Sequence, residues 1–410
     1  MPRPRVLVLD HTAQEGGAEL ALVRLLDELH DEGEFDLRVL LFGNGPLQAR
    51  LTSAGVQAAV LVLDEDVATM ARDTAAGGAA RSALSAAAFV PRLVRAIRGS
   101  GADLVVANSL KSAVFASIAA PLAGRRWVWH LHDRLAPDYL PRAPRTAMRW
   151  LAALGPRAIV ANSFATLETL PALAMRKAVV AYPGLAPEAF EVDTRAERDG
   201  TPLVGIVGRV SPTKGQREFL QAAAAVAVGH PDARFSVVGG ALFGEHDYES
   251  QLQSLADRLG IADRVEFTGW VADAAVRVAS LSVLVHASPV PEPFGQVIVE
   301  AMAAGVPVVA TAAGGVPEIL DPEAEGSVWT AGTPDATAGW RATPNGVLVR
   351  PGDPDALAEA IAYVLDDKQA ADARALAARA AAGSRFTIAR TASVVSAAWN
   401  GALPARRRVR

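Results

Sequence analysis

The chain has 410 residues, of which 51% are hydrophobic and 20% charged, and its formal net charge at pH 7 is -4. A chain of this length and composition is expected to form two domains with substantial apolar cores, which excludes a largely disordered protein. The sequence contains no cysteine, so disulfide bonds and thiol chemistry are excluded.

The beginning of the chain predicts a cytoplasmic protein. Asp10 interrupts the short apolar run from Val6 to Leu9, which leaves this run shorter than the core of a secretory leader. No uncharged apolar segment reaches about 18 residues, the length needed to cross a bilayer. We therefore expect a soluble, cytoplasmic chain.

The first half of the sequence alternates short apolar runs with longer segments of helical composition. Runs that are apolar on both faces and separated by helices are typical of parallel strands covered by helices. The expected strands are residues 5–10, 36–42, 58–63, 104–108, 127–132, 158–162 and 178–182, and the expected helices include residues 18–30, 83–98 and 145–153.

The second half repeats this alternation, so we expect two doubly wound α/β domains with ligands at the carboxyl ends of their strands. The predicted domains are residues 1–183 and 201–385, joined by a linker at 184–200 that is rich in proline, glycine and charge. Residues 386–410 are predicted to form one further helix, over 386–403, and a basic tail. The expected strands of the second half are residues 203–207, 234–238, 265–268, 282–286, 307–311 and 346–349.

Charge is unevenly distributed along the chain. Between Arg81 and Arg157 the sequence has twelve basic residues and three acidic ones, and the tail from Arg406 to Arg410 is also basic. Such a region favours an anionic acceptor or the anionic leaflet of a membrane. The alternative is a set of solvated arginines on helix faces.

The first turn of the second domain combines two cations with two glycines. Gly208-Arg209 directly follows an expected buried strand, and Lys214-Gly215 lies a short distance further on. An arginine can bind phosphate oxygens through two hydrogen bonds, and a lysine supplies a movable point charge. The turn therefore predicts a diphosphate site, the alternative being a surface turn with two solvated cations.

A second motif runs from Glu292 to Glu300, with the sequence Glu-Pro-Phe-Gly-Gln-Val-Ile-Val-Glu. A helix that begins near Gly295 would offer the free N–H groups of its first turn to a phosphate. We expect the two carboxylates to lie on one side of this helix and to span the length of a sugar and a diphosphate. The alternative is a capped helix whose carboxylates face water.

Other chemistries explain fewer of these residues. Two carboxylates also fit glycoside hydrolysis, but that hypothesis gives Arg209 and Lys214 no role. His130 and His132 lie on one face of an expected strand, yet no third ligand follows at a spacing typical of a metal site, so we expect no metal. The turn after the first strand lacks the Gly-x-Gly-x-x-Gly spacing of dinucleotide-binding proteins.

Together, these motifs resemble the retaining family-4 glycosyltransferases (glycosyl transferases group 1), which have the GT-B fold. The resemblance covers almost the whole chain and is most specific between Leu203 and Leu320. Besides the two motifs above, the matching segments are Ala301-Met-Ala-Ala-Gly-Val-Pro-Val-Val-Ala-Thr, Gly314-Gly-Val-Pro-Glu318, Gly346-Val-Leu-Val ahead of Pro351-Gly-Asp, the glycine loop Glu15-Gly-Gly-Ala-Glu19 and the strand end His130-Leu-His-Asp133. The resemblance implies two Rossmann-like domains facing across a cleft, with the donor in the second domain, the acceptor in the first, and a C-terminal helix that crosses back to the first domain.

The resemblance also implies a role for each matching residue. Arg209 and Lys214 would bind the donor diphosphate, Glu292 the hydroxyls of the transferred sugar and Glu300 the ribose. His132 would lie beside the reacting carbon. The other donor-binding residues implied are Gly16, Gly17, Gly208, Phe294, Gly295, Gln296 and Val297, with Trp270 where relatives pack the nucleotide base. A tryptophan at a strand end can also cap a core, and this alternative stays open for Trp270.

Two departures from the family pattern are visible. Tyr182-Pro183-Gly184 stands where an Asn-Gly pair commonly ends the first domain. Residues 321–344 form a longer polar segment than relatives usually carry, with Trp329 and Trp340, and we expect a surface loop there rather than an acceptor-side flap.

The predicted function is the transfer of a sugar from a nucleotide-diphosphate sugar to an acceptor hydroxyl, with retention of configuration, by front-face attack and without a metal or other cofactor. The expected partners are the donor, an unknown hydroxyl acceptor and, through the basic region, a membrane surface; nucleic acid is not expected. The alternatives are a GT-B-shaped sugar phosphorylase, a nucleotide-sugar epimerase or a partner subunit without turnover. The motifs do not specify the donor base, the sugar or the acceptor.

Overall fold

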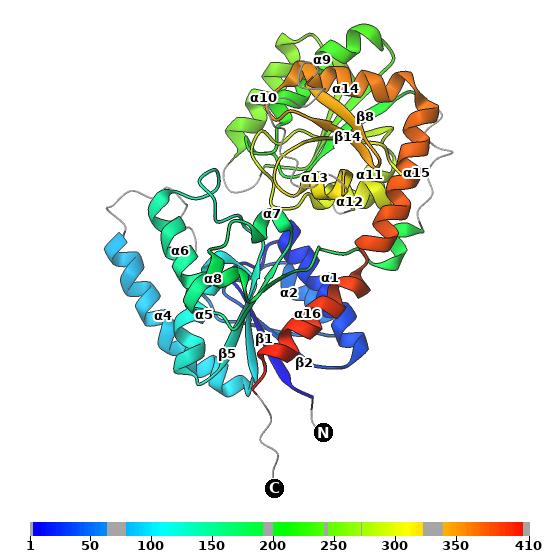
Figure 1. The fold of residues 1–410 in the computed structure, drawn as a ribbon. Helices are drawn as coiled ribbons and strands as arrows, with labels where there is room; N and C mark the ends of the chain where they lie inside the picture. The colour runs from blue at the N-terminus through cyan, green and yellow to red at the C-terminus, as the bar shows by residue number, and fades with distance from the viewer. Residues whose placement is uncertain are drawn as a thin grey trace. The chain divides into compact units, whose positions relative to one another are not determined.

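The computed structural model describes residues 3–63, 79–191, 200–241, 245–271, 273–322 and 339–404, without the side chains of residues 79–84. The chain divides into two compact units (Figure 1). Unit 1 comprises Met1–Gly184 and Ile388–Arg410, and unit 2 comprises Leu185–Thr387. Each unit contains one seven-stranded sheet covered by helices, which confirms the predicted α/β class.

The sheet of unit 1 is entirely parallel and has the strand order β3-β2-β1-β4-β5-β6-β7. Its strands are β1 (Arg5–Asp10), β2 (Asp36–Leu41), β3 (Gln57–Val60), β4 (Leu104–Ala107), β5 (Arg126–Leu131), β6 (Ala158–Ala161) and β7 (Ala178–Val180). The strand order reverses between β1 and β4. In doubly wound domains, ligands bind beside the carboxyl ends of the strands at such a reversal.

Helices cover both faces of this sheet, and a separate apolar core fills each interface. The helices of unit 1 are α1 (Gly17–Glu32), α2 (Leu47–Ser53), α4 (Ala79–Ser100), α5 (Leu110–Leu122), α6 (Arg142–Leu154), α7 (Phe164–Leu167), α8 (Ala172–Met175) and α16 (Ile388–Ala402). One core is formed largely by the face that α4, α5 and α6 cover, and the other by the face that α1, α2 and α16 cover. Burial on both faces explains why the strands read as continuous apolar runs.

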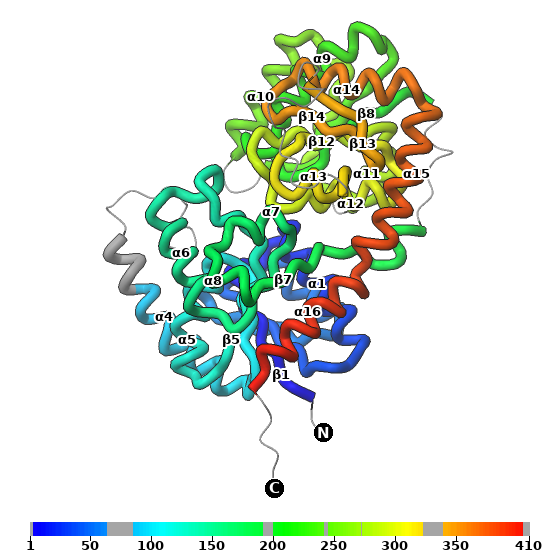
Figure 2. The backbone as a smooth tube through the Cα atoms, in the orientation of Figure 1, coloured from blue at the N-terminus to red at the C-terminus, as the bar shows by residue number. Residues whose placement is uncertain are grey.

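The last helix of the chain, α16, belongs to unit 1, as predicted. It runs beside α1 (Figure 2) and contributes the fully buried Trp399. The ring of Trp399 meets Phe35 edge-on at 5.4 Å between centroids and stacks on His130 at 5.6 Å. Aromatic contacts of this kind add to the apolar area that the helix buries, so α16 is an integral part of the core of unit 1.

The sheet of unit 2 has the order β10-β9-β8-β11-β12-β14-β13, and its reversal lies between β8 and β11. Its strands are β8 (Leu203–Val207), β9 (Arg234–Val238), β10 (Val265–Gly269), β11 (Val283–His286), β12 (Val308–Thr311), β13 (Trp340–Thr343) and β14 (Gly346–Val349). All described pairs are parallel except that of β13 with β14.

The edge strand β13 corrects the prediction of a surface loop over residues 321–344. Residues 340–343 pair with β14, and the Trp340 ring packs against Tyr363 at 4.8 Å. A short antiparallel edge strand needs only one neighbour, which a tight turn at Pro344 and Asn345 supplies, so its sequence carries no long apolar run. Residues 323–338, including Trp329, lie outside the described residues.

The helices of unit 2 cover both faces of its sheet. They are α9 (Gln216–Gly229), α10 (His246–Arg258), α11 (Ala274–Ala279), α12 (Gln296–Ala303), α13 (Val316–Leu320), α14 (Pro354–Asp366) and α15 (Lys368–Arg385), with short 3-10 turns at Pro187–Phe190 and Ala262–Arg264. Leu185, the second residue of the predicted linker, belongs to this unit, and its amide donates to the Phe386 carbonyl at 2.8 Å. Among the described helices, none combines the length and the apolar character that crossing a membrane requires.

Candidate functional site

In unit 2, one predicted cation and one predicted carboxylate meet near the carboxyl ends of β8 and β11. Lys214, in the turn between β8 and α9, donates to both carboxylate oxygens of Glu292, with Nζ to Oε1 and Oε2 distances of 2.7 and 2.9 Å. The two residues are far apart in sequence, so the sheet brings them together. The contact therefore joins the residue predicted to bind the diphosphate, Lys214, to the residue predicted to bind the sugar, Glu292.

Glu292 has a second basic neighbour. His286, the last residue of β11, lies with its Nε2 3.6 Å from Glu292 Oε2, and its Nδ1 contacts the Thr311 hydroxyl at 3.2 Å. Burial alone would raise the pKa of the Glu292 carboxyl, but Lys214 and His286 hold this pKa well below its usual range. Glu292 is therefore an ionised hydrogen-bond acceptor, as expected of a group that binds sugar hydroxyls.

Arg209 also has a carboxylate partner. Its Nη1 lies 2.7 Å from Glu245 Oε2, and the other oxygen of Glu245 accepts from the Ser211 hydroxyl at 2.9 Å. Gln216 holds this turn in shape, because its Nε2 donates to the Arg209 carbonyl at 2.9 Å. A carboxylate thus lies at each of the two cations predicted to bind phosphate.

The helix predicted after Gly295 is α12, and Gly295 is its N-cap with φ of 113°. This left-handed conformation favours glycine over residues with a side chain. The first-turn N–H groups of Gln296 and Val297 have no partner within the helix, which suits an anion. Glu300 lies one turn into the helix and accepts from Gln296 Nε2 at 3.0 Å.

Glu292 precedes α12, as expected for a helix that begins near Gly295. Its backbone pairs with Gly314 in an isolated parallel bridge, which holds the segment ahead of the helix. The common orientation of the Glu292 and Glu300 carboxylates stays a prediction.

The remaining donor-binding predictions fall into two groups. Gly208 follows β8 directly, and Trp270 follows β10 with 61% of its surface exposed, which excludes the core-cap alternative for this tryptophan. The Phe294 side chain, in contrast, is buried against Phe386 at 5.9 Å between ring centroids. The Phe294 side chain therefore supports the loop from inside the unit.

In unit 1, three polar side chains meet where β1, β4 and β5 end. Asp10 and Asn108 are buried, and Asn108 Nδ2 donates to Asp10 Oδ2 at 2.7 Å. His132 Nε2 lies 3.0 Å from Asn108 Oδ1. Burial lowers the pKa of His132, and the charges of Asp133 and Asp10 offset this only in part, so the imidazole is neutral at pH 7.

The neighbouring His130 has a structural role. It is buried, and its Nε2 accepts from Trp399 Nε1 at 3.0 Å. Burial lowers the pKa of His130 to about 3. Within the described part of the chain, no group of three or more His, Asp, Glu or Cys side chains is arranged to hold a metal ion.

Gly16 is the N-cap of α1 and Gly17 is its first residue, and the Glu19 side chain lies against Gly16. A Cβ built on Gly16 would lie 2.3 Å from Glu19 Oε2, whereas one on Gly17 would meet nothing within 4 Å. Burial, with the nearby charge of Asp10, raises the pKa of Glu19 to about 7. Glu19 is thus an acid at the helix N-terminus that exchanges its proton near neutral pH.

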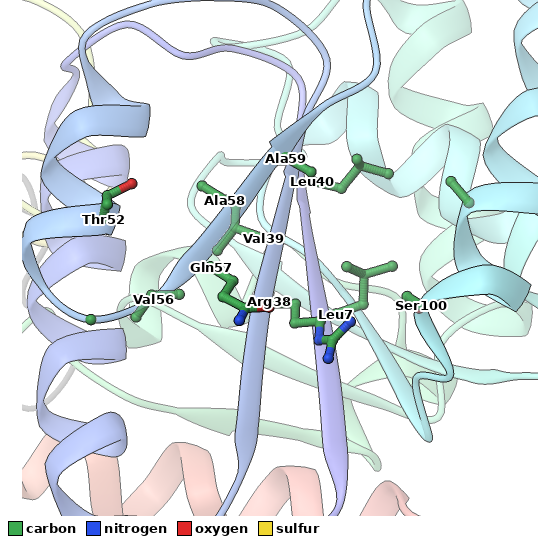
Figure 3. A pocket seen from close by; sticks show the side chains of 12 residues that line it. Leu7, Arg38, Val39, Leu40, Thr52, Val56, Gln57, Ala58, Ala59 and Ser100 are labelled. Carbon is green, nitrogen blue, oxygen red and sulfur yellow. The ribbon is translucent and has the colours of Figure 1, made fainter.

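None of the predicted site residues lines the pocket shown in Figure 3. This pocket of about 640 Å³ lies against β1, β2 and β3, between Ala96 and Ser100 of α4 and the segment from Thr52 to Ala59. Its walls are mostly apolar, with the Arg38 side chain beside Leu7. The polar clusters described above, rather than this pocket, therefore form the candidate site.

Five residues of these clusters were not predicted from the sequence to be site residues: Asp10, Glu19, Asn108, Glu245 and His286. Asp10, Asn108 and His286 each end an apolar strand run at a reversal of strand order, and this signal was available in the sequence. Glu19 was quoted only as part of the glycine loop. Glu245 carries no local signal, because its partner Arg209 lies on a different segment.

Family models match both units. Residues 189–381 match the model described as "Glycosyl transferases group 1", and residues 16–182 match that described as "Glycosyl transferase 4-like domain". Two curated relatives are D-inositol 3-phosphate glycosyltransferases. The one from Mycolicibacterium smegmatis is 34% identical over 232 residues, which is 55% of this chain and 47% of that protein. The one from Mycobacterium sp. (strain KMS) is 37% identical over 146 residues, which is 34% of this chain and 32% of that protein.

One similar solved structure aligns with almost the whole chain, whereas the curated relatives align with about half of it or less. Anabaena HepE in complex with UDP and glucose has a TM-score of 0.80 and 28% identity, over 97% of this chain and 100% of that chain. A further structure of HepE, in complex with UDP-glucose, has a TM-score of 0.79. Sucrose-phosphate synthase from Thermosynechococcus elongatus, at 18% identity and a TM-score of 0.74, shares the fold.

Proposed function

Because the chain belongs to the group 1 glycosyltransferases, with a glycosyl transferase 4-like domain ahead of the group 1 domain, we propose that it transfers a sugar from a nucleotide-diphosphate sugar to an acceptor hydroxyl. The proposed donor is a UDP-sugar, since HepE has been crystallised with UDP and with UDP-glucose. The transfer retains the anomeric configuration and uses no metal ion.

The contact between Lys214 and Glu292 carries this proposal. It joins a cation suited to a phosphate with an ionised carboxylate suited to sugar hydroxyls, at the carboxyl ends of β8 and β11 where the strand order reverses. A glycoside hydrolase needs two carboxyl groups but no such cation. The pairing therefore favours a ligand that is both sugar and phosphate.

In the proposed step, the acceptor oxygen bonds to the anomeric carbon on the face from which the diphosphate departs. The electron pair of the breaking bond leaves with the diphosphate, and a phosphate oxygen takes the proton of the acceptor hydroxyl. Arg209 and Lys214 stabilise the charge that develops on the diphosphate, which preorganised cations do without reorganisation cost. Glu292 orients the sugar, Glu300 binds the ribose, and the exposed Trp270 is available to stack on the base.

A thermal-shift panel of UDP, GDP, ADP and TDP, run with and without EDTA, tests the donor site, with Glu300→Ala as the matched variant. A ligand present at about a hundred times its dissociation constant stabilises the protein by roughly 2.7 kcal/mol. We expect a shift for UDP that EDTA does not abolish and that Glu300→Ala weakens. No shift with any nucleotide would contradict the proposal and favour a phosphorylase or a partner subunit, while a shift that disappears in EDTA would contradict metal independence.

We further propose that unit 1 binds an anionic membrane surface through α5 and α6, which would bring a lipid-linked or anionic acceptor to the enzyme. On α6, Trp150 and Leu154 lie one turn apart and are 64% and 71% exposed, and Arg142 and Arg145 precede them on the same helix. On α5, the exposed apolar residues recur at four-residue intervals and are Val114, Ile118 and Leu122. An apolar stripe flanked by arginines is typical of helices that lie in a membrane interface.

A further inference from the structure

The hydrogen bonds among Asp10, Asn108 and His132 have directions that chemistry fixes. A carboxylate oxygen only accepts, so Asn108 must turn its Nδ2 amide group toward Asp10, at 2.7 Å. The other end of the amide, Oδ1, then faces His132 Nε2 at 3.0 Å and can only accept. His132 Nε2 must therefore carry the ring proton.

This assignment leaves the second ring nitrogen of His132 without a proton. Burial lowers the pKa of His132, so the ring is neutral and carries one proton. No residue in the described part of the chain bonds to Nδ1 of His132. His132 as a whole residue is partly exposed, whereas Asp10 and Asn108 are buried.

We propose that Asp10 and Asn108 are positioning residues that fix His132 as the Nε2–H tautomer and make its Nδ1 an acceptor for a ligand hydroxyl. The proposed function supplies the ligand class, since both a sugar donor and its acceptor carry hydroxyl groups. A carbonyl or phosphate oxygen has no proton to donate to Nδ1 and is disfavoured there. The residues thus select for a hydroxyl at this position.

His130, which lies in β5 two residues before His132, provides an internal control. The Trp399 indole N–H can only donate, so His130 Nε2 accepts its hydrogen bond at 3.0 Å. This nitrogen of His130 therefore carries no proton. A neutral His130 must therefore carry its proton on Nδ1. The two histidines are expected to be opposite tautomers in one protein.

The experiment is a long-range 1H–15N correlation spectrum of the full chain labelled at histidine, recorded without any ligand near pH 7.5. His132→Gln assigns the His132 signals by their loss. We expect an Nε2–H tautomer for His132 and an Nδ1–H tautomer for His130. Asn108→Leu should abolish the single tautomer of His132 and leave His130 unchanged, and Asn108→Ala serves the same comparison if the leucine variant does not fold. Asp10→Asn should keep the tautomer, because the new amide oxygen still accepts from Asn108.

An Nδ1–H signal for His132 in the wild type would overturn the inference. So would an undiminished Nε2–H signal in an Asn108 variant whose His130 signals show a native fold. The spectrum needs no nucleotide, so its outcome is separate from the panel of the proposed function. A negative panel would leave the tautomer result standing, and an Nδ1–H signal beside a positive panel would remove only this inference.

Discussion

At the scale of single residues, the two cations predicted to bind phosphate have carboxylate partners in the protein itself. Lys214 contacts Glu292, and Arg209 contacts Glu245. A diphosphate offers more negative charge and more acceptor oxygens than one carboxylate, so it can replace either partner. Donor binding is therefore expected to exchange ion pairs, with Glu292 remaining beside His286 when Lys214 turns to the phosphate.

The first prediction concerns Lys214→Ala. Loss of a cation that stabilises the departing diphosphate should reduce sugar transfer about tenfold or more. The measurement is kcat/KM for transfer from the donor that the nucleotide panel identifies. Lys368→Ala, which removes an exposed lysine at the start of α15, is the control and should leave transfer unchanged. Wild-type turnover in Lys214→Ala would remove the diphosphate role of this residue.

The second prediction concerns the pH dependence that Glu19 confers. Its pKa is raised from 4.5 to about 7, so folding favours the protonated carboxyl. This stabilising contribution is fully present below pH 4.5 and is lost as the pH rises through about 7. A shift of this size corresponds to at most about 3 kcal/mol, and partial solvent access reduces it.

Glu19→Gln keeps a neutral side chain at every pH, so it should match the wild type near pH 4.5 and exceed its stability at pH 8. Urea unfolding at the two pH values measures the difference. Glu32→Gln, an exposed glutamate on the same helix, is the control and should show no such divergence. Equal stability of Glu19→Gln and wild type at pH 8 would contradict the raised pKa.

At the scale of elements, local sequence predicted most strands because the central strands of both sheets are buried apolar runs. Those at Leu203–Val207, Arg234–Val238 and Gly346–Val349 were predicted at their observed bounds. The strand predicted at residues 178–182 is two residues too long, because β7 ends at Val180. The edge strand β13 was missed because pairing on one side alone requires little apolar sequence.

The third prediction concerns α6. Replacing both Trp150 and Leu154 by alanine removes the exposed apolar residues of this helix and keeps its arginines. The double variant should sediment several-fold less with vesicles of phosphatidylcholine and phosphatidylserine, because apolar insertion and charge act together. The wild type should bind weakly to phosphatidylcholine alone.

The control for α6 is Val228→Ala on α9, which removes an 86% exposed apolar residue from unit 2. Its vesicle binding should equal that of the wild type. Equal binding by the α6 double variant would show that this helix does not contact the membrane, and absence of wild-type binding to the anionic vesicles would contradict the proposed membrane surface altogether.

At the scale of the whole molecule, the chain passes between the two units twice, after Gly184 and after Thr387. The two connecting segments contact each other: Leu185 forms a β-bridge with Thr387, and its amide donates to the Phe386 carbonyl. Unit 1 is therefore built from two separate segments of the chain. Its core includes α16, which follows all of unit 2 in the sequence.

The sequence by itself determined the fold class, most strand positions and the two donor motifs, because apolar periodicity, glycine-dependent turns and neighbouring cations are local properties. The tertiary structure decided which side chains are partners. Asp10 and Asn108 are 98 positions apart, Lys214 and Glu292 are 78 apart, and Arg209 and Glu245 are 36 apart. The order of the strands in the folded sheet brings such residues together. The hydrogen bonds from which the His132 tautomer is inferred can form only in that folded arrangement.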